Sequence, residues 1–128
     1  MRIVGHGVDI VVVSRVERLR ERHGDVFMER VFTPAERAYC DSARGRAERL
    51  AGRFAAKEAV FKVLGSGWRG SMQWTDVETL PDALGKPVIT LHGESARRAA
   101  EMGIARVLIS LSHAGGYAVA SALGVSDT

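Results

Sequence analysis

The sequence predicts a single globular domain over residues 1–128 that mixes helices with strands. Its length suits one domain, and hydrophobic residues make up 46% of the chain, which is enough for a packed core. Aromatic residues contribute only 6%, so Val, Leu, Ile and Ala must fill most of that core. Segments rich in β-branched residues alternate with segments of helical periodicity, without repeats or linkers between them.

The first element is predicted to be a buried strand over residues 3–13, because β-branched side chains dominate it. Gly5 and Gly7 within it indicate a bulge or the close approach of another group. Asp9 lies in its middle, where a carboxylate must either reach solvent or find a compensating cation.

Three helical segments are expected next. The pattern becomes helical over residues 14–23, Gly24 stops it, and residues 25–31 predict a further short piece. Thr33-Pro34-Ala35-Glu36 combines an N-cap, a proline at the first helical position and a glutamate placed for a capping box. A helix starting there should run toward Ser42.

The remaining elements are separated by clear turn residues. A turn is predicted at 43–49, a long helix at about 48–64 that Gly65 ends, and a loop at 65–70. Two strands are expected at 74–80 and 87–91, around a turn at 81–86. A helix is expected at 94–102, closed by Gly103, and then a hairpin formed by 106–112 and 117–123.

Bulk properties narrow the function classes. Cys40 is the only cysteine, so it cannot form an internal disulfide, and a reducing cytosol is favoured. Asp9 interrupts the first apolar run, and no stretch approaches membrane-span length, so we expect a cytoplasmic protein without membrane association. The net charge of +3 fits an acidic protein partner, a phosphorylated ligand, nucleic acid or nothing specific.

The helix at 48–64 carries the strongest site signal. At 100° per residue, small and β-branched side chains occupy one half, which should be buried. The other half mixes bulky apolar residues with four charges that we expect to line a site: Arg53, Lys57, Glu58 and Lys62. Glu58 and Lys62 could equally form an ordinary surface ion pair. Lys57 projects between apolar neighbours and needs an anion nearby, unless its ammonium reaches solvent.

Two acidic residues suggest a metal. Asp9 and Glu58 together would supply the one or two carboxylates with which proteins commonly hold Mg²⁺, although a lone buried aspartate is more often structural. The cations of the long helix would then suit a polyphosphate. His113 ends a strand at a glycine-bearing turn and could face the same ligand, or it could be an ordinary turn histidine.

These segments, in their order along the chain, resemble the holo-acyl carrier protein synthase family nearly end to end. The residues that carry the resemblance are 5–10 (Gly-His-Gly-Val-Asp-Ile), 30–33 with Glu36, 50–59 (Leu-Ala-Gly-Arg-Phe-Ala-Ala-Lys-Glu-Ala) with Phe61, Lys62 and Gly65, then 85–87, and Ser112-His113. The motif around Ala56-Lys57-Glu58 is the most specific of them. The resemblance implies an α+β phosphopantetheinyl transferase fold, with an antiparallel sheet packed on a long helix, assembled as a homotrimer.

The resemblance also implies an activity and its site. The serine hydroxyl of an apo-acyl carrier protein attacks the β-phosphate of coenzyme A, with Mg²⁺ held by Asp9 and Glu58. The implied catalytic residues are Glu58, Lys62 and His113. The implied coenzyme A contacts are Arg53, Lys57, Lys62, Gly65, Ser66, Gly85, Lys86, Pro87 and His113. Glu58 is the best candidate base, although a carboxylate that binds metal accepts protons poorly.

The family's partner is a small acidic helical protein. Arg15, Arg18 and Arg22 recur at helical spacing with Leu19 beside them, and we predict that this stripe docks the carrier protein. Such a stripe is more often only a solvated helix face. Two other functions remain possible: a non-catalytic module that binds coenzyme A or a nucleotide, and, less favoured, a nucleic-acid-binding protein. Aromatic residues suited to base stacking are sparse, so we expect no nucleic-acid partner.

Overall fold

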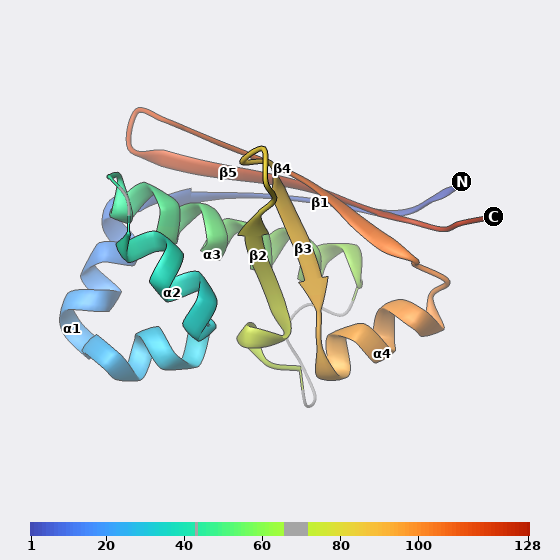
Figure 1. Ribbon diagram of the computed structural model, residues 1–128, viewed down its shortest axis with the longest axis horizontal. Helices are drawn as coiled ribbons and strands as arrows, with labels where there is room; N and C mark the ends of the chain where they lie inside the picture. Colours follow the sequence, from blue (N-terminus) through green and yellow to red (C-terminus); the bar gives the residue numbers. More distant parts are fainter. Residues whose placement is uncertain (43, 66–71) are drawn as a thin grey trace.

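Two antiparallel sheets and a long helix between them form an α+β fold in the computed structural model, which describes residues 1–42, 44–65 and 72–128 (Figure 1). The larger sheet has the strand order β1-β5-β4, and β2 pairs with β3 in the smaller one. The strands are β1 (Ile3–Val12), β2 (Val77–Pro81), β3 (Pro87–Leu91), β4 (Arg106–Ala114) and β5 (Tyr117–Val125). The helices are α1 (Val13–Val31), α2 (Pro34–Asp41), α3 (Arg46–Val63) and α4 (Gly93–Glu101), with a short 3₁₀ turn η1 (Trp74–Asp76).

The glycines of β1 allow the larger sheet to lie directly on α3. A Cβ atom at Gly7 would lie 2.1 Å from the carbonyl oxygen of Ala59, and one at Gly5 would lie 2.8 Å from that of Val63. The pairing of β1 with β5 also shifts register between Ile3 and Gly5. The predicted bulge and the predicted close approach are therefore both confirmed.

The prediction that the first strand is buried is wrong for one of its faces. Val8, Ile10 and Val12 point away from α3, and Ile10 is 62% exposed. Strand side chains alternate between the two faces of a sheet, and only the inner face is covered by helices (Figure 1). The outer face of β1-β5-β4 consequently exposes apolar side chains, to which β4 adds Leu108 and β5 adds Tyr117.

The helix signals of the N-terminal third are confirmed. Gly24 interrupts α1 with φ 53°, a conformation that glycine adopts readily. At the start of α2, Glu36 N donates to Thr33 Oγ1 at 3.1 Å, and Thr33 N donates to Glu36 Oε1 at 2.9 Å. This is the predicted capping box, and it fixes the direction in which α2 leaves the preceding turn.

Helix α3 is buried on almost every side, whereas the sequence predicted that only one half of its surface would be buried. Its alanines pack as expected, but Leu50, Phe54 and Phe61 of the other half are buried too. The three-stranded sheet covers one side of α3, and α1, α2 and β2 contact the rest. Any charged side chain on this helix must therefore find a protein partner, or an opening between the surrounding elements.

The later elements differ from prediction mainly at their ends. Residues 74–76 form η1 instead of extending the strand, because the Asp76 side chain accepts a hydrogen bond from Gln73 N at 3.1 Å and holds a turn. The predicted hairpin is confirmed and two residues longer on each strand. Gly115 and Gly116 join its strands with φ 58° and 83°, the signs that a type I′ turn requires. No helix in the described part of the chain is long and apolar enough to cross a membrane.

Replacing Gly7 with Ala should destabilise the protein, because the new methyl group would overlap the carbonyl oxygen of Ala59. We expect a loss of about 3 kcal/mol or more in the free energy of unfolding, measured by urea denaturation. Gly52→Ala is the matched control, since its Cβ would meet only Leu111 at 3.9 Å. It should be neutral or stabilising by up to about 1 kcal/mol. Equal effects of the two substitutions would contradict the close packing of β1 on α3.

Candidate active site

Asp9, Glu58 and Lys62 come together where β1 crosses α3. Asp9 points toward the helix from the inner face of β1, next to Gly7. Lys62 Nζ lies 3.3 Å from Asp9 Oδ1 and donates to the carbonyl oxygen of Val8 at 2.8 Å. Burial raises the pKa of the half-buried Glu58, and the negative charge of Asp9 raises it further, while Lys62 and Arg15 oppose this rise.

This cluster has a donor set that suits a hard divalent cation. The carboxylates of Asp9 and Glu58 are near enough for their charges to interact. Lys62 forms its ion pair with Asp9, so the alternative of a simple Glu58–Lys62 ion pair does not describe this structure. Within the described ranges, no group of three or more His, Cys, Asp or Glu side chains could hold a metal ion. Two carboxylates without further protein ligands suit Mg²⁺, which keeps several waters and takes phosphate oxygens.

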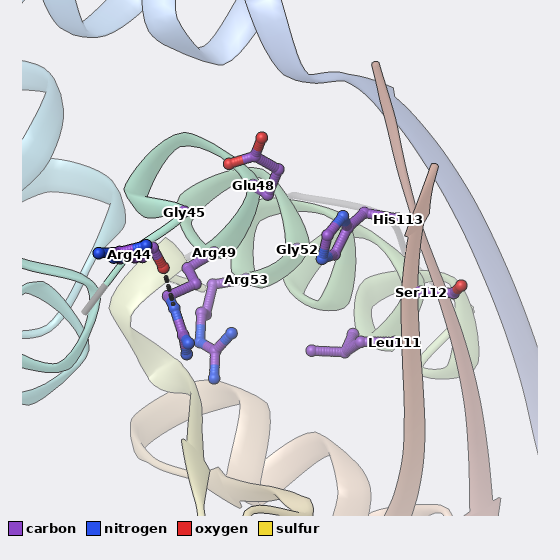
Figure 2. Close-up of a pocket in the computed structure, with 9 residues that line it drawn as sticks. All are labelled: Arg44, Gly45, Glu48, Arg49, Gly52, Arg53, Leu111, Ser112 and His113. Carbon is purple, nitrogen blue, oxygen red and sulfur yellow. Dashed lines mark hydrogen bonds between the residues drawn. The ribbon is translucent and has the colours of Figure 1, made fainter. Parts of the chain in front are cut away.

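A second candidate site is a pocket of about 430 Å³ at the N-terminal half of α3. Figure 2 shows its lining residues, which are Arg44, Gly45, Glu48, Arg49, Gly52, Arg53, Leu111, Ser112 and His113. Arg53 is 6% exposed, and its buried Nε has no hydrogen-bond partner. Arg49 Nε donates to the carbonyl oxygen of Arg44 at 2.9 Å. A pocket with this many guanidinium groups is suited to an anion.

His113 reaches this pocket from β4, where it pairs with Ala118 and shares the inner face of the sheet with Leu111. The structure thus joins His113 with Arg53, two residues that the sequence assigns to one ligand. The structure does not place His113 and Arg53 beside Asp9 and Glu58. The carboxylates lie at the β1 edge of the larger sheet and His113 lies at the β4 edge, with β5 between them.

Lys57 does not reach either site. Its side chain is 0% exposed, and its ammonium donates to Glu36 Oε1 at 2.8 Å and to the carbonyl oxygens of Val77 and Trp74 at 2.5 and 3.1 Å. All three ammonium protons are therefore used within the protein. Burial lowers the pKa of Lys57, and Glu36 opposes that shift.

The contacts of Lys57 in this structure are therefore structural, and they leave no free donor for the predicted phosphate contact. The anion that Lys57 requires is Glu36, which sequence reasoning treated only as a helix cap. Glu36 is fully buried and also accepts a hydrogen bond from Thr79 N at 2.9 Å. This network ties α2 and β2 to α3.

The other predicted coenzyme A contacts are dispersed. Gly65 is exposed after the end of α3, and Ser66 lies outside the described residues. Gly85 and Lys86 lie in the β2–β3 turn, where the Asp82 side chain accepts a hydrogen bond from Lys86 N at 3.0 Å, and Pro87 begins β3. Of these, the four that the structure describes do not line the arginine pocket.

The predicted docking residues form one surface. Arg15, Arg18, Leu19 and Arg22 line a depression of about 520 Å³ on α1, together with Glu21. The positive charge of Arg15 is near enough to oppose the raised pKa of Glu58. The basic depression and the carboxylate cluster are therefore neighbours.

A carboxylate pair, a lysine and an arginine pocket together suit a ligand that carries phosphate groups. The sequence profile of the 4'-phosphopantetheinyl transferase superfamily matches residues 5–122, and the chain belongs to this superfamily. It is 51% identical to a holo-[acyl-carrier-protein] synthase of Desulforudis audaxviator over 126 residues, which is 98% of this chain and 95% of the relative.

Solved structures agree with this assignment. The holo-[acyl-carrier-protein] synthase of Neisseria meningitidis aligns with a TM-score of 0.88 at 36% identity, over 98% of this chain and 100% of that one. The Helicobacter pylori enzyme in complex with coenzyme A aligns with a TM-score of 0.83 at 30% identity, over 94% and 99% of the two chains. The α+β fold that the sequence resemblance implied is thereby confirmed.

Replacing Lys57 with Met should destabilise the protein by about 3–5 kcal/mol, because Glu36 would remain buried without its cation. The double variant Glu36→Gln with Lys57→Met should lose less, since an uncharged amide can keep accepting from Thr33 N. Urea denaturation of the wild type and the two variants measures this. If the double variant is less stable than Lys57→Met, the charge pair is not the source of the loss.

Proposed function

We propose that this chain transfers 4'-phosphopantetheine from coenzyme A to a serine of an apo-acyl carrier protein. The products are the holo-carrier protein and adenosine 3',5'-bisphosphate. The observation that carries the proposal is the cluster of Asp9, Glu58 and Lys62 beside a basic surface on α1, within a chain of this superfamily. As a single catalytic domain over residues 1–128, it would act in the cytoplasm and support fatty acid biosynthesis, and it could also serve polyketide carrier proteins.

The residues of the cluster divide the chemistry between them. Glu58 is the proposed acceptor of the serine proton through a water, because a carboxylate that also holds the metal accepts a proton poorly itself. Lys62 stabilises the charge that develops on the leaving phosphate. The 3.3 Å contact with Asp9 holds the Lys62 ammonium in place for this role.

Mg²⁺ is the cofactor that this cluster fits. Asp9 and Glu58 would hold it, and when bound it would neutralise pyrophosphate charge. Mn²⁺ prefers the same oxygen ligands, so the donor set does not separate the two ions.

Coenzyme A carries two groups of phosphates, and the chain offers two sites. The pyrophosphate belongs with the carboxylate cluster and Lys62, where the reaction occurs. The arginine pocket, with Arg53 and His113, suits the 3'-phosphate of the nucleotide. Gly65, Ser66 and the turn at 85–87 remain proposed contacts along the ligand between these ends.

One molecule of coenzyme A would reach both sites most directly if two subunits share it. The carboxylate cluster and the arginine pocket lie at opposite edges of the larger sheet in one subunit. The same sheet exposes an apolar outer face with Val8, Ile10, Val12, Leu108 and Tyr117. Covering this face with copies of the chain would bury it, and a closed symmetric trimer would repeat the shared site.

The acyl carrier protein is proposed to dock on the depression around Arg15, Arg18, Leu19 and Arg22. Guanidinium groups around an apolar residue suit an acidic helix of the partner. The nearness of Arg15 to Glu58 would bring the partner's serine to the reacting phosphate.

The alternative is a module that binds coenzyme A or a nucleotide without catalysis. Such a module would use the arginine pocket but would need neither Asp9 nor Glu58. The clustering of the two carboxylates, in which the charge of Asp9 raises the pKa of Glu58, favours catalysis over this alternative.

Intact mass spectrometry of an apo-acyl carrier protein tests the proposed reaction. Incubation with the protein, coenzyme A and Mg²⁺ should add the mass of one phosphopantetheine, and EDTA should abolish the gain. Glu58→Gln should lower the rate by at least about 100-fold, because it removes a metal ligand and the proposed base. The absence of a mass gain with several carrier proteins would favour the binding module.

The proposed docking surface predicts a separate kinetic effect. Replacing Arg15 and Arg22 together with Glu should raise the KM for the carrier protein by about ten-fold or more, because repulsion replaces electrostatic steering. The KM for coenzyme A should change little, and the wild-type KM for the carrier protein should rise with salt. Steady-state kinetics with an unchanged carrier-protein KM would reject this surface.

A further inference from the structure

The ring of Tyr39 lies against two arginines of the pocket. The guanidinium carbon of Arg53 is 4.6 Å from the ring centroid, and that of Arg49 is 5.0 Å from it. Arg49 also donates a hydrogen bond to the Tyr39 hydroxyl. Tyr39 belongs to α2, and the capping box fixes the start of this helix. Cys40, the residue after Tyr39, is fully buried. The ring is therefore a fixed surface under both guanidinium groups.

The charges of these two arginines are not neutralised by the protein. Across the described ranges, neither Arg49 nor Arg53 forms an ion pair with a carboxylate, although Glu48 also lines the pocket. Arg53 is nevertheless almost completely buried, and its Nε has no partner. A buried cation of this kind is costly unless something compensates it.

An aromatic ring compensates a cation in a different way from a carboxylate. The negative face of the ring attracts the guanidinium, but it leaves the net charge and the in-plane N–H donors available. A carboxylate at position 39 would pair with those donors and compete with a phosphate for them. The ring therefore stabilises the empty pocket while preserving its affinity for an anion.

We propose that Tyr39 is a positioning residue that holds Arg49 and Arg53 ready to bind the 3'-phosphate of coenzyme A. This inference rests on the proposed function, because it takes coenzyme A as the ligand. Tyr39 acts through the two arginines and takes no part in the reaction at the pyrophosphate. It should therefore affect binding of the nucleotide end and leave turnover nearly unchanged.

Calorimetric titration with adenosine 3',5'-bisphosphate and with adenosine 5'-monophosphate tests this role. Tyr39→Leu should weaken binding of the bisphosphate about ten-fold, in the range of desolvated cation–π contacts, and the monophosphate less than about two-fold. Tyr39→Phe keeps the ring and loses only the acceptor for Arg49, so it should weaken the bisphosphate by about two- to three-fold. Arg37→Ala, on the same helix but paired with Asp25, is the control and should bind as the wild type does.

Kinetics separate positioning from a general structural role. Tyr39→Leu should raise the KM for coenzyme A while kcat stays within about two-fold of the wild type. The KM for 3'-dephospho-coenzyme A should not change. Wild-type affinity in Tyr39→Leu, or an equal loss for both nucleotides in Tyr39→Phe, would overturn the proposal.

The two proposals fail in different ways. Nucleotide binding needs no carrier protein, so it can be measured whether or not the chain transfers phosphopantetheine. Normal selectivity for the bisphosphate without any transfer would reject the proposed reaction and retain the role of Tyr39. Transfer with an unchanged KM for coenzyme A in Tyr39→Leu would retain the proposed reaction and reject the role of Tyr39.

Discussion

The contact between β1 and α3 is the constraint on which the rest of the structure depends. Because Gly7 has no side chain, the strand backbone lies directly on the helix at Ala59, where even one methyl group would overlap. This contact aligns the next inward residue of the strand, Asp9, with the helix turn that carries Glu58 and Lys62. A glycine therefore builds the candidate metal site without contributing a ligand to it.

A buried ion pair supplies the second constraint. Lys57 and Glu58 are adjacent, but a step of 100° around α3 separates their surroundings. Lys57 turns inward to Glu36 and the start of β2, and Glu58 turns toward Asp9. The Ala-Lys-Glu motif thus has two roles. Lys57 links α3 to α2 and β2, and Glu58 belongs to the candidate metal site.

Local signals in the sequence predicted most elements, and long-range partners account for the errors. The capping box, the stop at Gly24 and the hairpin at Gly115-Gly116 depend on neighbouring residues, so they could be predicted. Lys57 could not be placed, since its partner lies 21 residues away in another helix. The Asp9–Glu58 pair could be predicted from the sequence because each carboxylate lies in an apolar segment, where a charge needs a partner or a function. Tyr39 gave no such signal, because a tyrosine in a short helix is ordinary.

The candidate site is divided within one subunit, since the carboxylates and the arginine pocket occupy opposite edges of one sheet. Our central proposal is that two copies of the chain complete each active site across the exposed apolar face. Mixing Glu58→Gln with Arg53→Ala, at a coenzyme A concentration too low for the Arg53 variant to bind it, and allowing their subunits to exchange tests this claim directly. The account predicts that transferase activity reappears in the mixture, because some interfaces then combine an intact carboxylate cluster with an intact arginine pocket. Exchange of subunits, verified by mass, without any recovery of activity would contradict it.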